Sequence, residues 1–355
     1  MPAAVDWQFA QRVAVRVAGR EPFSRSYHYE SLGPDFAELT EQAEALVTAE
    51  TGLVSLAGPA RARVTDRAGW INANVASFQR LLRPILDKFG SRLESNPLSP
   101  LAKKFAGAEV GMMLGWMSTR VLGQYDLLII EDENPADQDI VYYVGPNVLA
   151  LERQFAFPPR EFRLWLALHE VTHRAQFTGV PWMRPHFLGL VEQTLDSVDP
   201  DPKRFAEALG RVASAFRSGE NPLADGGLMA LVASSEQREV LDRVSGLMSL
   251  LEGHGDVTMD RAGEGLLPSA ERFARVLRQR RQNASGPARL LQQLIGLEAK
   301  LNQYAQGERF IELVEANGGP ELLARAWEQP ENLPTLAEIR EPSAWIERLT
   351  LALAP

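Results

Sequence analysis

The sequence predicts a mainly α-helical protein of the α+β class with one small β-sheet. Apolar residues recur every three to four positions over most of the 355 residues, which is the period of an amphipathic helix. One segment departs from that period: the β-branched and aromatic runs Tyr125 to Glu131 and Ile140 to Val144 flank a polar turn that contains a proline. Such a pattern is typical of a β-hairpin. We therefore expect extensive helices around one hairpin.

Three helices are expected near the N-terminus. Asp6 precedes a helical pattern that runs to about Val17, and a carboxylate in that position can accept hydrogen bonds from the first turn. A second pattern runs from about Pro34 to Thr51, and a third starts near Asp66 and stops by Phe89. The chain from Arg160 onward also reads as helices, broken by loops rich in glycine and proline.

A glycine recurs every fourth residue at Gly107, Gly111 and Gly115. This spacing places the three glycines on one face of a helix, where a neighbouring helix can approach closely. Lys103 and Arg120 bound a segment that is too short to cross a membrane. We therefore expect the glycine face to pack against another helix of the same protein.

Composition excludes several classes of function. The net charge of −9 and the isoelectric point near 5.3 disfavour a surface that follows nucleic acid or binds anionic lipid. The absence of cysteine excludes disulfides and thiolate chemistry, so a metal would need His, Asp or Glu ligands. The first twenty residues carry dispersed charges, unlike a signal peptide, and we expect a cytoplasmic protein with no membrane or nucleic-acid partner.

The chemically informative motif is HExxH, formed by His169, Glu170 and His173 within a helical stretch from Arg160 to Thr178. Two histidines four residues apart lie one above the other on a helix, so both can bind one tetrahedral ion. The glutamate lies one step around the helix, toward the open side of that ion. The motif therefore predicts a zinc site, with Glu170 as a general base for a zinc-bound water.

The two histidines belong to a single stripe of the same helix that begins with apolar residues. This stripe consists of Phe162, Trp165, Leu166, His169, His173 and Gln176. Two imidazoles on a buried face need a polar partner, and one metal ion supplies it for both rings.

A third metal ligand must come from elsewhere in the chain, and we favour Glu252. The apolar stripe that it continues consists of Leu241, Val244, Met248 and Leu251. A buried carboxylate on such a stripe needs a cation. His254 is the alternative ligand, but two positions along a continuous helix place it on nearly the opposite side, so both can bind only if Gly253 breaks the helix. An ion pair between Glu252 and a local arginine such as Arg261 is the structural alternative.

Several segments together resemble a bacterial family of zincin-like hydrolases, regarded as zinc-dependent metalloproteases. The segments are HEVTHRAQF, PWMRPHF and EGHGDVTMD, with DRAGWINANVASF, LGWMSTRVLGQYD, LEAKLNQYAQGERF and WIERL elsewhere in the chain. The resemblance covers most of the length. Some family members are labelled as associated with deazaflavin coenzyme biosynthesis. We do not adopt that association, because no Rossmann-type glycine turn follows a strand in this chain.

The resemblance implies a zincin core that carries the HExxH helix, helical additions, and a gluzincin-like third ligand at Glu252. We accordingly expect an N-terminal helical region over 1–124 and a zincin core over 125–195. A C-terminal helical region over 196–355 would supply the third ligand, and all three regions would form one compact unit.

The predicted function is that of a zinc-dependent peptidase. We expect His254 to donate to the oxyanion of the tetrahedral intermediate, with His186 and Tyr304 as alternatives, and Asp256 to accept from a ligand histidine. The edge of the hairpin could bind an extended peptide, which favours a peptide or protein substrate over a small amide or ester. The alternative function is a binding or scaffold protein in which the metal has only a structural role.

Overall fold

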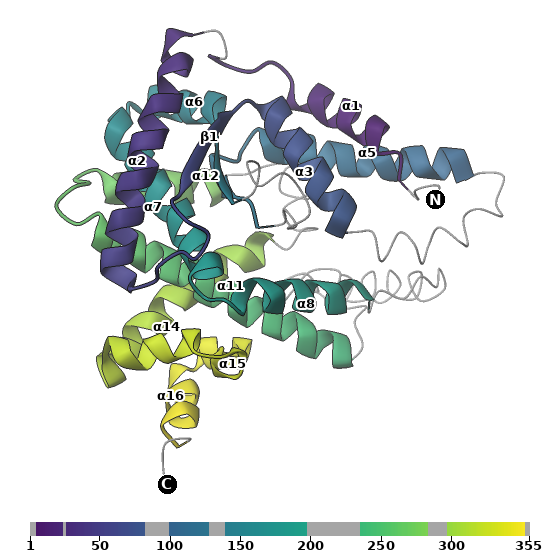
Figure 1. Cartoon of the computed structure of the whole chain (residues 1–355). Helices are drawn as coiled ribbons and strands as arrows, with labels where there is room; N and C mark the ends of the chain where they lie inside the picture. The colour runs from purple at the N-terminus through teal and green to yellow at the C-terminus, as the bar shows by residue number, and fades with distance from the viewer. Residues whose placement is uncertain are drawn as a thin grey trace. The chain divides into compact units, whose positions relative to one another are not determined.

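A computed structural model describes residues 5–23, 26–81, 99–127, 139–196, 235–282 and 297–351 (Figure 1). The described chain is mostly helical with a small three-stranded sheet, which confirms the predicted fold class. Its helices and strands are α1 (Trp7–Ala18), α2 (Tyr27–Thr51), β1 (Arg61–Thr65), α3 (Arg67–Leu81), α5 (Ser99–Ser118), β2 (Gly123–Tyr125), β3 (Ile140–Val144), α6 (Gly145–Phe155), α7 (Pro159–Thr178), α8 (Met183–Asp196), α11 (Ser235–Ala262), α12 (Ala270–Gln282), α14 (Leu297–Ala324), the 3-10 turns η2 (Arg325–Trp327) and η3 (Pro330–Asn332), α15 (Leu336–Arg340) and α16 (Pro342–Leu351).

The chain divides into two compact units. Unit 1 consists of Met1–Gly179 and Thr258–Phe273, and unit 2 of Val180–Val257 and Ala274–Pro355. Helix α11 contributes to both, since its residues 235–257 belong to unit 2 and its residues 258–262 to unit 1.

The sheet lies in unit 1 and has the strand order β1-β3-β2. Strand β2 pairs with β3 in antiparallel orientation, as the sequence predicts, although β2 begins at Gly123 and the predicted continuation beyond residue 127 lies outside the described residues. Strand β1 was not predicted from the sequence; it pairs with β3 in parallel from Arg61 to Thr65. All five residues of β3 are buried, because this strand is central in the sheet.

The core of unit 1 forms where α2 packs on the sheet and on α7. Phe36 of α2 stacks on Tyr143 of β3 with ring centroids 3.8 Å apart, and both side chains are fully buried. The Tyr143 hydroxyl and Thr40 share a hydrogen bond of 2.8 Å. Burial raises the pKa of Tyr143 above its usual range, the hydrogen bond with Thr40 lowers it, and the nearby charge of Glu170 raises it. Tyr143 is therefore a neutral, packed core residue.

Helix α2 starts earlier than the sequence predicts, at Tyr27 instead of Pro34. The Ser26 side chain accepts a hydrogen bond of 3.3 Å from the His28 N–H and caps the first turn. Pro34 lies inside the helix on an exposed face. The capping serine therefore sets the helix start, and the proline does not.

Helix α1 packs lengthwise on α5, as Figure 1 shows. The Asp6 side chain accepts from the Phe9 N–H at 2.9 Å, which confirms the predicted cap. A Cβ atom on Gly107, Gly111 or Gly115 would approach backbone oxygens of α1 or its cap to 2.6 Å or less. The glycine face therefore packs against a second helix of the protein, as predicted from its spacing.

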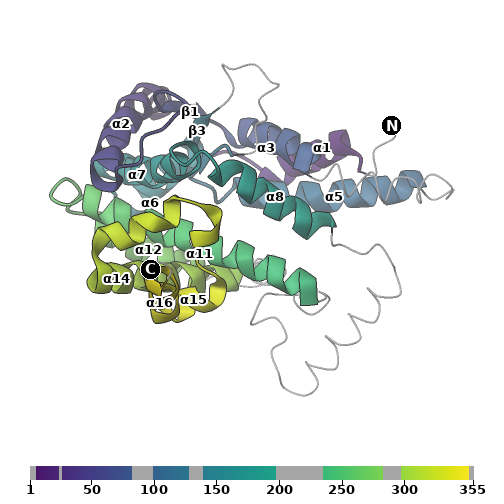
Figure 2. The same cartoon turned by 60° about the horizontal axis from the view of Figure 1, so that its bottom comes forward.

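Unit 2 has its own core around α14, α15 and α16, which lie side by side in Figure 2. Leu250 of α11, Phe310 of α14 and Trp345 of α16 are fully buried there. The Trp345 indole also donates a hydrogen bond of 2.8 Å to the Asn332 carbonyl. This core holds α11 against the C-terminal helices.

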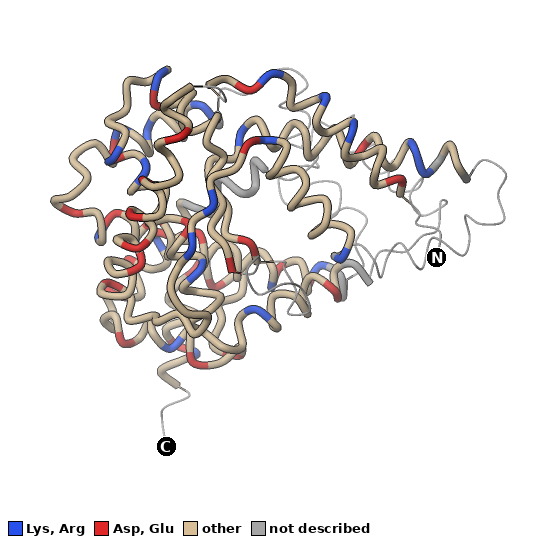
Figure 3. The backbone as a smooth tube through the Cα atoms, turned by 45° about the horizontal axis from the view of Figure 1, so that its top comes forward, with Lys and Arg blue, Asp and Glu red and all other residues tan. Residues whose placement is uncertain are grey.

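Charged residues of both signs are interleaved along the described chain (Figure 3). In the part of the chain that the structure describes, no helix is long and apolar enough to cross a membrane.

The packing of α1 on α5 predicts that Gly111→Ala destabilises the protein. The added Cβ would lie 2.4 Å from the Ala10 carbonyl oxygen and 2.8 Å from Val13 Cβ, so the helices must separate. We expect the free energy of unfolding to fall by about 1–3 kcal/mol, measured by urea denaturation. Gly33→Ala on the exposed side of α2 is the control, because nothing lies within 4 Å of its added Cβ. An equal effect of both substitutions would contradict this packing argument.

Candidate metal centre

Helix α7 carries the HExxH motif, and its N-terminal half is fixed by aromatic packing within unit 1. Pro159 occupies the first turn, where its preset φ favours helix initiation. Phe162 packs against Phe157 and Phe273 at centroid distances of 4.8 and 5.2 Å. Phe162 is fully buried and Trp165 nearly so, which confirms the buried start of the predicted stripe.

A buried ion cluster fixes α7 nearly two turns before the motif. Arg163 donates to both carboxylate oxygens of Glu152 on α6, at 2.7 and 2.9 Å, and also pairs with Asp35 on α2. Burial raises the pKa of Glu152 more than the hydrogen bond and charge of Arg163 lower it. The arginine therefore holds a carboxylate that is costly to bury without a partner.

A second buried arginine fixes the helix immediately after the motif. Arg174 is 1% exposed, donates to Asp139 at 2.6 and 3.0 Å and pairs with Glu44 of α2 at 2.5 Å. It also donates to the Gly58 carbonyl at 2.5 Å. Because Arg163 and Arg174 are eleven residues apart, they lie on the same face of α7. Together they set the rotation of the helix about its axis.

This rotation determines where the motif residues lie. Glu170 is seven residues after Arg163 and shares the face of the two arginines, whereas His169 and His173 lie on the adjacent face. Both histidines are half-buried, and Glu170 is buried. The histidines that are predicted to bind the metal and the glutamate that is predicted to act as the base therefore lie on two neighbouring faces of one helix.

The imidazoles of His169 and His173 approach each other through their Nε2 atoms. These atoms are 3.2 Å apart, and the ring planes are nearly perpendicular at 85°. Two ligands at about 2.05 Å from a tetrahedral zinc ion are separated by about 3.3 Å. The spacing of the two nitrogens therefore fits two ligands of one tetrahedral ion.

Gln176 sets the orientation of one of these rings. Its fully buried side chain presents Oε1 to His173 Nδ1 at 3.0 Å. An amide oxygen only accepts hydrogen bonds, so Nδ1 donates this one, and the neutral form of the ring then has its lone pair on Nε2. Gln176 was predicted only as a member of the stripe, and its position three residues after His173 was the available signal for this role.

Glu170 lies against the edge of the sheet. Its Oε2 accepts a hydrogen bond of 3.0 Å from the Tyr125 N–H in β2. A Cβ atom on Gly123 would lie 2.7 Å from Glu170 Cγ. This contact was not predicted from the sequence, because it joins residues 45 positions apart and no local pattern indicates it.

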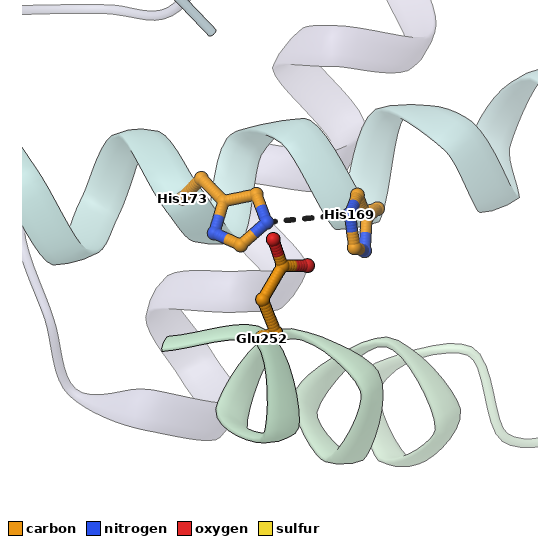
Figure 4. A group of neighbouring side chains, drawn as sticks. All are labelled: His169, His173 and Glu252. Atoms are coloured by element: carbon orange, nitrogen blue, oxygen red, sulfur yellow. Dashed lines mark hydrogen bonds between the residues drawn. The ribbon is translucent and has the colours of Figure 1, made fainter. Parts of the chain in front are cut away.

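Glu252 completes a group of possible metal ligands. One ligand atom from each of His169, His173 and Glu252 lies within 4.8 Å of the others, and Figure 4 shows the Glu252 carboxylate directed toward the imidazoles. Glu252 is 5% exposed. Among the described residues this is the one such group of His, Asp or Glu side chains. A His/His/Glu group of this kind could bind a metal ion, and it matches a donor set of catalytic zinc sites with a fourth position for water.

His254 does not belong to this group. Helix α11 continues through Gly253, so His254 lies about 200° around the helix from Glu252. Its buried ring packs edge-on against Trp327 at a centroid distance of 4.9 Å. The two residues therefore present opposite faces of α11.

The other candidate donors have different surroundings. His186 on α8 is half-buried and contacts Trp182, with ring centroids 5.9 Å apart. Burial and then the charge of Arg243 lower the pKa of His186, which favours its neutral form. Asp256 is half-buried on α11. The side chain of Tyr304 lies outside the described residues.

Comparisons with known proteins identify a family and a similar solved structure. A family model described as zincin-like metallopeptidase matches residues 5–346. Among solved structures, the chain is similar to a Chloroflexus aurantiacus protein described as a proposed hydrolase with a novel fold, at 31% identity and a TM-score of 0.72, covering 98% of this chain and 99% of that chain. A search of curated proteins gave no match. The expected family resemblance is thus confirmed, and the family implies a divalent metal.

The ion cluster of α7 predicts that Arg163→Met destabilises the protein in a pH-dependent way. The substitution leaves Glu152 and Asp35 without their cation, which costs about 3 kcal/mol at neutral pH. Removal of Arg163 takes away the hydrogen bonds and the charge that lower the pKa of Glu152, so this pKa rises further in the variant and the extra loss of stability grows as pH rises above 4.5. Denaturant unfolding at pH 5 and 7.5 measures this difference.

Arg160→Met on the same helix is the matched control. Arg160 pairs with Glu38, but both side chains are more than half exposed, so solvent screens the pair. We expect almost no change in the free energy of unfolding at either pH. A comparable loss in both variants would contradict the assigned role of the buried cluster.

Proposed function

The chain belongs to the zincin-like metallopeptidase family, and on this premise we propose that it is a zinc-dependent peptidase. The observation that carries the proposal is the pair of Nε2 atoms 3.2 Å apart in a group with Glu252. We propose His169, His173 and Glu252 as the three ligands of zinc. When bound, zinc lowers the pKa of a coordinated water to about 7.

Glu170 is the proposed general base. Its carboxylate lies one helix position from His169, on the neighbouring face, so it can take the proton of the attacking water and pass it to the leaving amine. The hydrogen bond from Tyr125 occupies Oε2 and restricts the rotamers of the side chain. A base held in one place loses less conformational entropy during the reaction.

The proposed substrate is a peptide or protein. Strand β2 lies at the end of the strand order among the described strands, and an extended peptide can add to such an edge through main-chain hydrogen bonds. The family description supports peptide hydrolysis over hydrolysis of a small amide or ester.

The assignment of His254 as an oxyanion donor stays a prediction. His254→Gln tests it, since a donor role lowers kcat about 10²-fold with little change in Tm. Lowered Tm with unchanged kcat would assign His254 to packing against Trp327 instead.

Substitution of the proposed base predicts loss of turnover without loss of the metal. Glu170→Gln keeps the size of the side chain and an oxygen for the Tyr125 N–H, but it cannot accept a proton from water. We expect kcat for peptide cleavage to fall about 10³-fold, with the zinc content unchanged. Peptide cleavage assays and elemental analysis measure both. Cleavage at the wild-type rate would remove this mechanism.

Substitution of the proposed third ligand predicts loss of the metal. We expect Glu252→Ala to weaken zinc binding at least about 100-fold, measured by competition with a chromophoric chelator. Glu239→Ala is the control, because Glu239 is an exposed carboxylate on the same helix. Equal zinc affinities of the two variants would exclude Glu252 as a ligand.

The same measurements decide the alternative of a metal-stabilised binding or scaffold protein. If the ion has only a structural role, its removal by a chelator should lower Tm. The wild type should then cleave no peptide, and Glu170→Gln should leave partner binding intact. Turnover that depends on Glu170 would exclude this alternative.

A further inference from the structure

Strand β2 contacts Glu170 at two successive outward positions. At Gly123, an added Cβ would lie 2.7 Å from Glu170 Cγ, 2.8 Å from Oε1 and 3.0 Å from Cδ. At Tyr125, the backbone N–H donates to Glu170 Oε2 at 3.0 Å. The whole end of the glutamate side chain therefore rests on the backbone of β2.

The hydrogen-bond pattern of the sheet makes the Tyr125 N–H available for this contact. The Val144 N–H donates to the Leu122 carbonyl, and the Asp126 N–H donates to the Ile140 carbonyl. Successive residues of a strand direct their backbone groups to opposite sides. Tyr125, which precedes Asp126, therefore directs its N–H away from β3 and toward α7.

Gly123 is needed for space and not for its backbone conformation. It is not among the glycines with positive φ, so alanine could adopt its backbone angles. The three nearest atoms to such a Cβ all belong to the Glu170 side chain. An alanine at this position would therefore displace that side chain and leave the strand itself unstrained.

We infer that Gly123 and the Tyr125 N–H are a positioning element for the Glu170 carboxylate. The inference rests on the proposed function for the role of Glu170, and it adds a positioning residue, Gly123, that the HExxH motif does not contain. Because Gly123 has no side chain, the Glu170 carboxylate can reach the edge of β2. The backbone N–H then holds one of its oxygens.

A double-substitution cycle tests the contact without requiring turnover. Thermal unfolding of the full chain is measured for Gly123→Ala in the wild type and in a Glu170→Ala background. We expect Gly123→Ala to lower Tm by about 2–4 °C in the wild type. In the Glu170→Ala background the atoms that the added Cβ would meet are absent, so the shift should nearly vanish. Equal shifts in both backgrounds would overturn the inference.

Gly33→Ala is the control for replacing a glycine in unit 1. Nothing lies within 4 Å of its added Cβ, so its effect on Tm should be the same in both backgrounds. Hydrogen exchange of the Tyr125 amide supplies a second measure. We expect this exchange to become faster in Glu170→Ala, and unchanged exchange would also overturn the inference.

Kinetics separate positioning from a general structural role. We expect Gly123→Ala to lower kcat for peptide cleavage at least about 10-fold, with KM and zinc affinity near the wild-type values. Unchanged kcat would overturn the positioning role. If the wild type neither binds zinc nor cleaves peptides, the proposed function fails, and the Tm cycle still decides whether Gly123 places the Glu170 side chain.

Discussion

The arrangement of this protein depends on two imidazole nitrogens that face each other across 3.2 Å on one helix. Neutral imidazoles that both present a lone pair at this distance repel, so the pair needs a shared proton or a shared cation. Gln176 fixes the Nδ1 proton of His173 and leaves its Nε2 as an acceptor. A divalent ion bound by both nitrogens meets this need, which is why the rest of the site is best explained around one.

The geometry of that pair depends in turn on how α7 is rotated. Arg163 and Arg174 lie on one face of the helix and are tied to carboxylates of α2 and α6 and to Asp139. Buried ion pairs of this kind contribute little net stability, but losing one partner is costly. Rotation of the helix would separate both arginines from their carboxylates, so the ion pairs restrict α7 to one orientation. In that orientation Glu170 contacts β2, and His169 and His173 lie on the neighbouring face of α7.

The sequence was sufficient for features that depend on local spacing. The Asp6 cap, the glycine face of α5 and the HExxH helix follow from patterns within one or two turns. Other features arise from pairing between distant segments and leave no local signal. Strand β1 is half-exposed with charged residues, and it is a strand because β3 offers it a parallel neighbour. The contact of Glu170 with Gly123 and Tyr125 is of the same kind, since nothing around Gly123 distinguishes it from a turn glycine.

That contact also bears on how a substrate could reach the edge of the sheet. An outward N–H on an edge strand is open to pairing with another chain, which natural sheets limit by covering such groups. The Tyr125 N–H is covered by Glu170, the residue that we propose as general base. A peptide that adds to β2 must therefore bind beyond Tyr125 or compete with Glu170 for its N–H. Competition would remove the contact that positions the carboxylate, so a productive substrate strand binds beyond Tyr125.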